Sequence, residues 1–210
     1  LHSAVPNESG TGAASLELAV IPPLGCKRRL VLGATKTEDT NKAPMVPRPR
    51  LGFVFPEIGK VLPYAGLAYV PPITVFGTRN VIASGEIGFG VPYESGLEWG
   101  MRYHYTLMKS IAEVATPFDK DDPPVDDFYS GSTFGLDALF GWDFEGLTPY
   151  LALGFTDVST FFYIGDDGIV SNNENPYFGL TSSLGLQWTK DWLDLAGEFY
   201  MAPGALYTGR

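Results

Sequence analysis

A two-residue alternation of side-chain type runs through most of this chain and constrains its fold more than any other feature. Between residues 81 and 107, apolar residues predominate at the odd positions on both sides of a short turn, as with Ile87, Phe89, Trp99 and Met101. Small or polar residues occupy the even positions. Successive side chains of a β-strand point to opposite faces, whereas a helix repeats every 3.6 residues. The pattern therefore predicts β-strands with one apolar and one polar face.

The alternation recurs in ten segments, which we interpret as five hairpins of an all-β, antiparallel, up-and-down sheet. The predicted strands lie at about residues 16–20, 30–34, 51–55, 65–69, 81–91, 97–107, 134–144, 147–155, 178–188 and 193–201. Tight turns are expected near 22–27, 56–60, 92–96, 143–147 and 189–192, and longer connections near 36–47, 71–80, 110–127 and 164–175. The phase changes around Asp157, which predicts a β-bulge. Short turns should thus gather at one end of the sheet and long connections at the other.

The composition agrees with many short strands in one domain, 1–210. The 210 residues include 25 Gly, 17 Pro and 14% aromatic residues, which favour turns and strands over helices. No run of 18 apolar residues occurs, so no transmembrane helix is expected. The net charge of −10 argues against a nucleic-acid partner, because a phosphate-binding surface needs a basic patch.

The positions of the aromatic residues favour lipid, rather than a soluble core, as the environment of the apolar face. One group lies beside the tight turns: Trp99, Trp142, Trp188 and Trp192. A second lies near the longer connections: Tyr69, Tyr105, Phe128, Phe161, Phe162 and Tyr177. Amphipathic rings favour the two interfaces of a bilayer, so two such groups predict two aromatic girdles. In lipid a sheet must also close, because no water is available for unpaired backbone groups.

With this alternation, these girdles and the turn asymmetry, the chain resembles the bacterial outer-membrane β-barrel class over nearly its whole length. The resemblance implies a transmembrane β-barrel of about 10 visible strands in the outer membrane, surrounded by membrane lipids. It points to no particular family, and no functional residue is carried over from it. If the tight turns are periplasmic, both ends of the chain would be extracellular, and the last residues lack the terminal aromatic usual in such barrels. We therefore expect one strand missing at each end and twelve strands in the complete protein.

The polar face predicts a lumen lined by ionisable residues. The residues chosen as lumen-lining or pore-lining are Arg50, Glu86, Glu98, Arg102, His104, Asp137 and Glu198. Further lumen candidates are Glu17, Arg29, Asp143 and Asp194. These charges either pair and plug the interior, or line a narrow polar pore in which the two arginines face the glutamates. Acidic residues outnumber basic ones, so a pore would show a mild preference for cations.

Two classes of function follow from this architecture. The first is a narrow channel for small polar solutes or ions. The alternative is a structural or docking barrel that anchors partner proteins of an envelope assembly, or forms a homo-oligomer. Small residues expected on the lipid face, Gly85 and Gly197, favour the second class because they permit close approach of a neighbour. A soluble lipid-binding β-barrel and an outer-membrane enzyme carry less weight.

Catalytic and metal-binding chemistry find little support in the sequence. His104 beside a carboxylate is a candidate general base, but no motif positions a serine nucleophile, so no enzyme activity is expected. The acidic segment 119–127 does not match the ligand spacing of an EF-hand. One cysteine, Cys26, and two histidines exclude Cys-rich or His-rich zinc sites. We therefore expect no metal and no cofactor.

Overall fold

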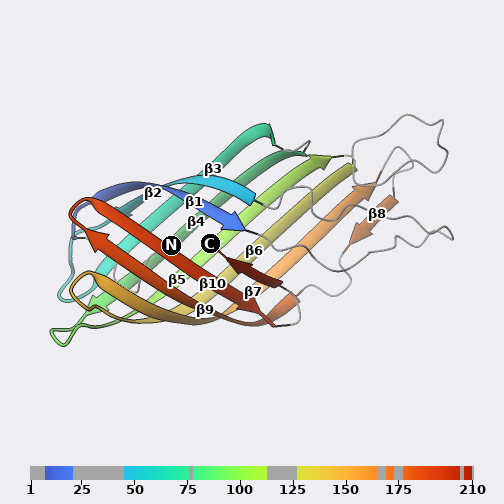
Figure 1. Cartoon of the computed structure of the whole chain (residues 1–210). Coiled ribbons are helices and arrows are strands. Elements are labelled where there is room, and N and C mark those ends of the chain that lie inside the picture. The colour runs from blue at the N-terminus through green and yellow to red at the C-terminus, as the bar shows by residue number, and fades with distance from the viewer. Residues whose placement is uncertain are drawn as a thin grey trace.

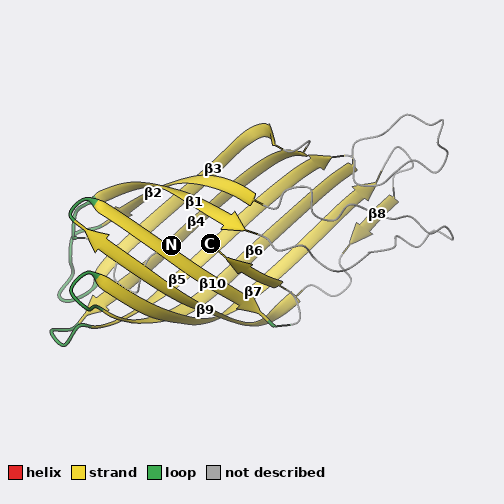
Figure 2. Cartoon of the chain, in the orientation of Figure 1, coloured by secondary structure: helices red, strands yellow, loops and turns green. Residues whose placement is uncertain are grey.

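The computed structural model of the 210-residue chain describes residues 8–20, 45–75, 78–112, 127–164, 169–172, 177–203 and 206–209. All regular structure in this part of the chain is β-strand (Figure 2). The strands are β1 (Gly12–Val20), β2 (Met45–Val54), β3 (Leu62–Val75), β4 (Thr78–Pro92), β5 (Leu97–Ala112), β6 (Asp127–Trp142), β7 (Leu147–Ile164), β8 (Ile169–Asn172), β9 (Tyr177–Lys190), β10 (Leu193–Ala202) and β11 (Leu206–Gly209). No helix among these residues is long and apolar enough to cross a membrane.

The strands form one curled, antiparallel, up-and-down sheet (Figure 1). From β1 to β7 each strand pairs with the next, and β7, β9, β10 and β11 continue the order. The short β8 pairs only with the end of β7 among the described strands. The curl brings β11 beside β1, where the described ladder is one residue pair, Val20 with Gly209. The sheet therefore curls around an interior, and within the described strands the seam between β1 and β10 is bridged by β11 at one end.

Nine of the ten predicted strands are confirmed, and the predicted strand at 30–34 lies outside the described residues. β1 pairs with β2 from Gly12–Phe53 to Val20–Met45, and its predicted partner at 30–34 is not among the described residues. β1 therefore begins at the tight-turn end of the sheet. The first strand therefore runs from the tight-turn end towards the long connections, opposite to the direction expected for it.

Two further details of the predicted connections are corrected. The long connection expected at 71–80 is a continuation of the β3–β4 hairpin, which stays paired as far as Val75 with Thr78. The register shifts once along this hairpin, between Val70 and Ile73, where two prolines without N–H groups follow each other. The bulge expected at Asp157 does not form, because both ladders of β7 keep their register through this residue.

The two faces of the sheet have opposite chemistry. Large apolar side chains on the convex face are exposed, and the exposed fractions of Phe178 and Leu16 are 73% and 71%. Ionisable side chains on the concave face are enclosed, and Asp137 and Glu198 are 3% and 4% exposed. Small apolar clusters in the interior complete the filling: Val54 with Leu62 and Tyr64, and Leu139 with Ala152. The predicted direction of each face is therefore confirmed.

Candidate functional site

A network of charged side chains fills the middle of the interior, and the strand register explains how it assembles. Antiparallel pairing sets Arg102 of β5 opposite Asp137 of β6 and Glu86 of β4 opposite His104 of β5. Directly opposite residues point to the same face, where their Cβ atoms lie about 4.5–5.5 Å apart. Alternation along each strand directs these residues inwards, and pairing across strands brings opposite charges together.

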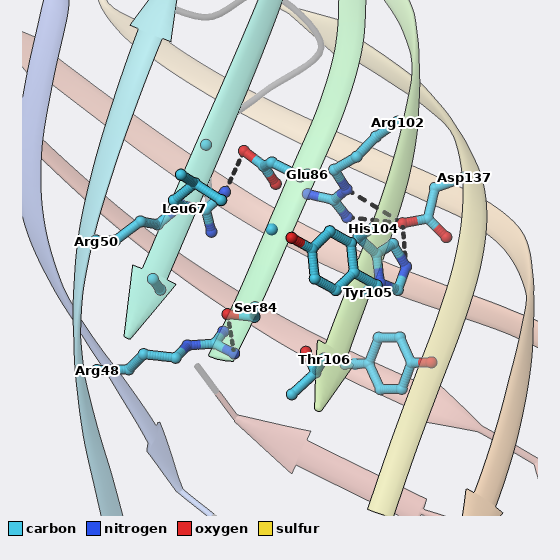
Figure 3. A pocket seen from close by; sticks show the side chains of 14 residues that line it. Arg48, Arg50, Leu67, Ser84, Glu86, Arg102, His104, Tyr105, Thr106 and Asp137 are labelled. Carbon is cyan, nitrogen blue, oxygen red and sulfur yellow. Dashed lines mark hydrogen bonds and ion pairs between the residues drawn. The ribbon is translucent and has the colours of Figure 1, made fainter. Parts of the chain in front are cut away.

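The first half of the network joins β1, β2 and β4. The Glu17 carboxylate contacts the guanidinium groups of both Arg48 and Arg50, with 3.4 Å between Oε2 of Glu17 and Nη1 of Arg50. Arg50 also forms an ion pair with Glu86, two strands away (Figure 3). Arg48 donates a hydrogen bond of 3.1 Å to Oγ of Ser84. Two arginines and two glutamates thus balance their charges within this half.

The second half of the network centres on Asp137. Arg102 donates to Oδ2 of Asp137 through Nε at 3.2 Å and through Nη2 at 2.8 Å. Nε2 of His104 lies 3.3 Å from the same oxygen (Figure 3). Arg102 is 6% exposed, so this pair is enclosed on all sides. Glu198 on β10 and Glu86 on β4 also attract the Arg102 guanidinium, which links the network to the opposite side of the interior.

Tyrosine side chains extend the network between β7 and β10. The hydroxyl of Tyr150 donates a 3.0 Å hydrogen bond to Oε2 of Glu198. Closer to the long connections, the hydroxyls of Thr156 and Tyr200 lie 3.2 Å apart. β9 lies between β7 and β10, so each of these contacts spans the inner surface of a strand. Such contacts tie non-neighbouring strands together as well as neighbouring ones.

Glycines on the inner face make room for the large polar side chains. A Cβ added to Gly185 would collide with the ring of Tyr150, and one added to Gly135 would collide with the imidazole of His104. The absence of a side chain at these positions lets the rings lie flat on the neighbouring strand. The richness of the polar face in glycine is therefore a packing requirement of this interior.

Two cavities adjoin the network. The cavity between the two halves measures about 40 Å³ and is lined by Arg48, Arg50, Glu86, Arg102, Asp137 and others (Figure 3). Since one ordered water needs about 10–15 Å³ on this measure, the cavity holds a few waters at most. A larger cavity of about 300 Å³ lies beside β1, β2 and β10. The lining of this larger cavity also includes Glu17, Arg50 and Glu86, so free volume adjoins the charged network on this side.

The convex face carries an apolar belt of nearly constant height. Its outward-facing runs, apolar except at Ser182, span eleven residues at 97–107 and 178–188, and nine residues at 134–142 and 147–155. Directly beyond these runs, towards the long connections, the outward positions become polar at Lys109, Ser132 and Asp157. Asp157 marks the end of the belt on β7, which explains the change of pattern that had predicted a bulge.

The four tryptophans predicted as a girdle, Trp99, Trp142, Trp188 and Trp192, gather at the tight-turn end of the belt. The ring of Trp142 stacks on Phe144 with centroids 6.2 Å apart. Of the second aromatic group, Tyr69 and Tyr105 lie on the convex face, and the ammonium of Lys109 stands 4.7 Å from the ring centroid of Phe128. The side chains of Phe161, Phe162 and Tyr177 lie outside the described residues.

All seven predicted lumen residues lie on the concave face, and six of them join or adjoin the network. These six are Arg50, Glu86, Arg102, His104, Asp137 and Glu198. Glu98 lies apart from them, near the tight turns beside Gly141. The sequence prediction missed Arg48 and Tyr150. Arg48 lies in β2, which begins at Met45, whereas the predicted strand began at residue 51.

The glycines predicted as an open patch on the lipid face differ from each other. Gly197 is open, since an added Cβ would meet nothing within 4 Å. Gly85 is covered by the ring of Tyr105, 2.8 Å from where a Cβ would stand, so the prediction of an accessible patch there was wrong. In the described part of the chain, no group of three His, Cys, Asp or Glu residues is arranged to hold a metal ion. Residues 113–126, which include the acidic segment 119–127 except its last residue, lie outside the description, as does Cys26.

No family model, no curated protein and no solved structure matches this chain.

Proposed function

We propose that this chain is a β-barrel that spans a bacterial outer membrane and has an interior closed by ion pairs. The observation that carries the proposal is the reversed polarity of the sheet, with the carboxylates and guanidiniums enclosed and the leucines and phenylalanines exposed. In water, burying apolar surface is the main driving force for folding, at roughly 25 cal/mol per Å². A sheet that instead presents its whole apolar face outwards gains this energy only when hydrocarbon surrounds it.

The dimensions of the belt support the same proposal. A transmembrane β-strand needs about 9–11 residues when it is tilted, and barrels of this class carry an apolar band about 25 Å tall. The outward apolar runs of nine to eleven residues agree with this length. The belt has tryptophans at one border and polar residues at the other, namely Lys109, Ser132 and Asp157. Such borders are suited to the two interfaces of a bilayer.

The filled interior favours a structural or docking barrel over an open channel. Charges that pair across the interior tie its walls together, and the cavity between the two halves of the network admits only a few waters. In such a barrel the contacts with other envelope components would be made by the outer surface and the long connections. No solute path is needed for this role.

A narrow channel is the second candidate, and one observation favours it. Polar groups continue along the concave face on both sides of the network, from Glu98 near the tight turns to the 2.6 Å hydrogen bond between Ser110 and Asn80. If the ion pairs exchange partners, this lining would offer a polar path. Acidic side chains would then give a mild preference for cations.

Refolding into lipid tests the membrane proposal. The chain, unfolded in urea, is diluted into phospholipid vesicles and, in parallel, into buffer without lipid. We expect it to float with the vesicles, resist carbonate extraction and migrate on gels differently before and after boiling. Folding to a monomer that stays in solution without lipid or detergent would refute the proposal and favour a soluble lipid-binding barrel.

Conductance separates the two candidate roles once insertion is established. In planar bilayers a closed barrel should show no steady current. Steady, cation-selective steps from the inserted protein would instead favour the channel. Purification in mild detergent complements this measurement, since a stoichiometric partner supports docking.

A further inference from the structure

Two cations stand on the convex face where the apolar belt ends, on the side of the long connections. Arg79 lies on β4 and Lys109 on β5, and both side chains are exposed. The residues that follow them, Asn80 and Ser110, share a hydrogen bond of 2.6 Å on the concave face. Successive residues of a strand face opposite sides of the sheet. The two cations therefore point outwards.

The strand register sets these cations close together. Arg79 is paired with Ile111, two residues beyond Lys109 on β5, so the two cations are diagonal neighbours. Such neighbours lie about 7–8 Å apart, within reach of long side chains. The ammonium of Lys109 is turned towards the long connections, since it lies 4.7 Å from the ring centroid of Phe128, the partner of Ile111 on β6. Both positive charges thus stand at one level, just outside the belt.

Hydroxyl groups flank the cations on the same face. Thr74 of β3 is paired directly with Arg79, and Ser130 of β6 is paired directly with Lys109. Directly paired residues point to the same face, with Cβ atoms about 4.5–5.5 Å apart. The neighbouring strands β3 to β6 therefore each present one hydrogen-bond donor (Figure 1). We call Thr74, Arg79, Lys109 and Ser130 the basic patch.

No carboxylate among the described residues forms an ion pair with either cation of the basic patch, whereas Arg48, Arg50 and Arg102 in the interior each contact one. The carboxylate at the same border of the belt, Asp157 on β7, is paired with Phe134 of β6. Phe134 lies four residues from Ser130, which is roughly 13 Å along the strand. Within the described strands, the charge of the basic patch is therefore not balanced on its own face.

We propose that the basic patch binds the phosphate headgroup of an anionic lipid in the leaflet on the side of the long connections. Guanidinium, ammonium and hydroxyl groups all donate hydrogen bonds to phosphate oxygens, and the charged donors form the stronger ones. The inference rests on the proposed function, because it requires hydrocarbon around the belt.

The position of the basic patch favours a lipid over a soluble anion. On β4 and β5 the last apolar outward residues before the patch are Val81 and Leu107. A lipid whose acyl chains lie against these residues places its phosphate beside the cations. Lys109 already extends away from the belt, as lysines do at the interface of a bilayer. The net charge of −10 repels a free anion, whereas a lipid is held at the patch by its chains as well.

Quenching by labelled lipids tests the site locally. In a Cys26→Ser background, bimane is attached through Leu107→Cys, directly beside the patch, or through Leu180→Cys, in the belt on β9. The 210-residue chain is inserted into phosphatidylcholine vesicles that contain a small fraction of lipid with a nitroxide high on its acyl chain. The headgroup of this quencher is either phosphatidylglycerol or phosphatidylcholine, in which choline balances the phosphate. We expect at least about a fivefold preference for phosphatidylglycerol at residue 107 and none at residue 180, since one Lys or Arg near an anionic surface contributes roughly that factor.

Three double variants identify the groups responsible for this preference. Arg79→Gln/Lys109→Gln should abolish it at residue 107. Arg79→Lys/Lys109→Arg keeps both charges and should retain it. Lys60→Gln/Lys190→Gln removes two exposed cations at the tight-turn end and should leave it unchanged, which makes it the matched control.

Four results would overturn the inference. They are equal quenching by the two lipids at residue 107, an equal preference at residue 180, a preference that survives Arg79→Gln/Lys109→Gln, and a preference removed by inorganic phosphate at constant ionic strength. The last would assign the patch to a soluble anion. Insertion is confirmed first by flotation with the vesicles. Failure to insert therefore counts against the proposed function, whereas insertion without a lipid preference counts against the basic patch alone.

Discussion

Replacing Arg102 by methionine tests whether the interior network holds the barrel together. Arg102 is 6% exposed and gives two hydrogen bonds to one carboxylate oxygen, at 2.8 and 3.2 Å. Without it, Asp137 retains only His104 from the described cluster. Breaking a buried ion pair by removing one partner costs about 3–5 kcal/mol, because the other charge remains buried and uncompensated. A loss of about 4 kcal/mol corresponds to roughly a thousandfold change in the unfolding equilibrium.

The assay is reversible urea unfolding in phospholipid vesicles, followed by tryptophan fluorescence. The double variant Arg102→Met/Asp137→Leu removes both charges and should recover most of the loss, since an apolar replacement of a buried pair is often neutral. Glu94→Gln, in an exposed tight turn, serves as the control and should stay within about 0.5 kcal/mol of the parent. A folded Arg102→Met variant that loses less than about 1 kcal/mol would refute the reasoning, since the pair would then be hydrated.

Three further predictions use the same vesicle system. Gly185→Ala should lower the free energy of unfolding in urea by about 1–3 kcal/mol, because the new methyl group displaces the ring of Tyr150. Gly197→Ala, in open space, should leave it nearly unchanged. Equal effects of the two substitutions would contradict the packing of the interior. Leu184→Arg, in the apolar belt, should destabilise the inserted protein by about 2–4 kcal/mol, and a change near zero would place that position in water. Lipids brominated near the headgroup should quench the four tryptophans more strongly than lipids brominated at the chain ends, and the reverse order would contradict the girdle.

The period of the side-chain pattern predicted nearly all of the fold because the strands alternate exposed apolar side chains with enclosed polar ones. Prediction failed where proline interrupted the pattern. Pro47 and Pro49 lie in β2 outside its ladder with β3, and Pro71 and Pro72 lie at the one register shift of the β3–β4 hairpin. Proline is typical of loops, but in each case the strand tolerates it because few hydrogen bonds between strands are lost.

The sequence predicted which residues share the concave face, but not which of them contact one another. Alternation alone places Arg50 and Glu86 inwards, but their meeting depends on the curl of the sheet and on the register of the intervening β3. The sequence did not predict the role of Tyr150, because a tyrosine counts as apolar in the alternation of apolar and polar residues. Its hydroxyl nevertheless donates a hydrogen bond to Glu198. Asp157 was misinterpreted as a bulge because the height of the apolar belt is a property of the whole barrel, not of one strand.

The central claim is that the Leu/Phe/Trp face meets hydrocarbon, and spin labels on neighbouring residues test it most directly. In a Cys26→Ser background, a nitroxide is attached through Leu184→Cys on the convex face or through Ser183→Cys on the concave face. In vesicles the label at residue 184 should relax faster with oxygen, which dissolves in lipid, than with a water-soluble nickel chelate. A label at 184 that responds mainly to the nickel chelate, in protein confirmed to be folded, would contradict the account.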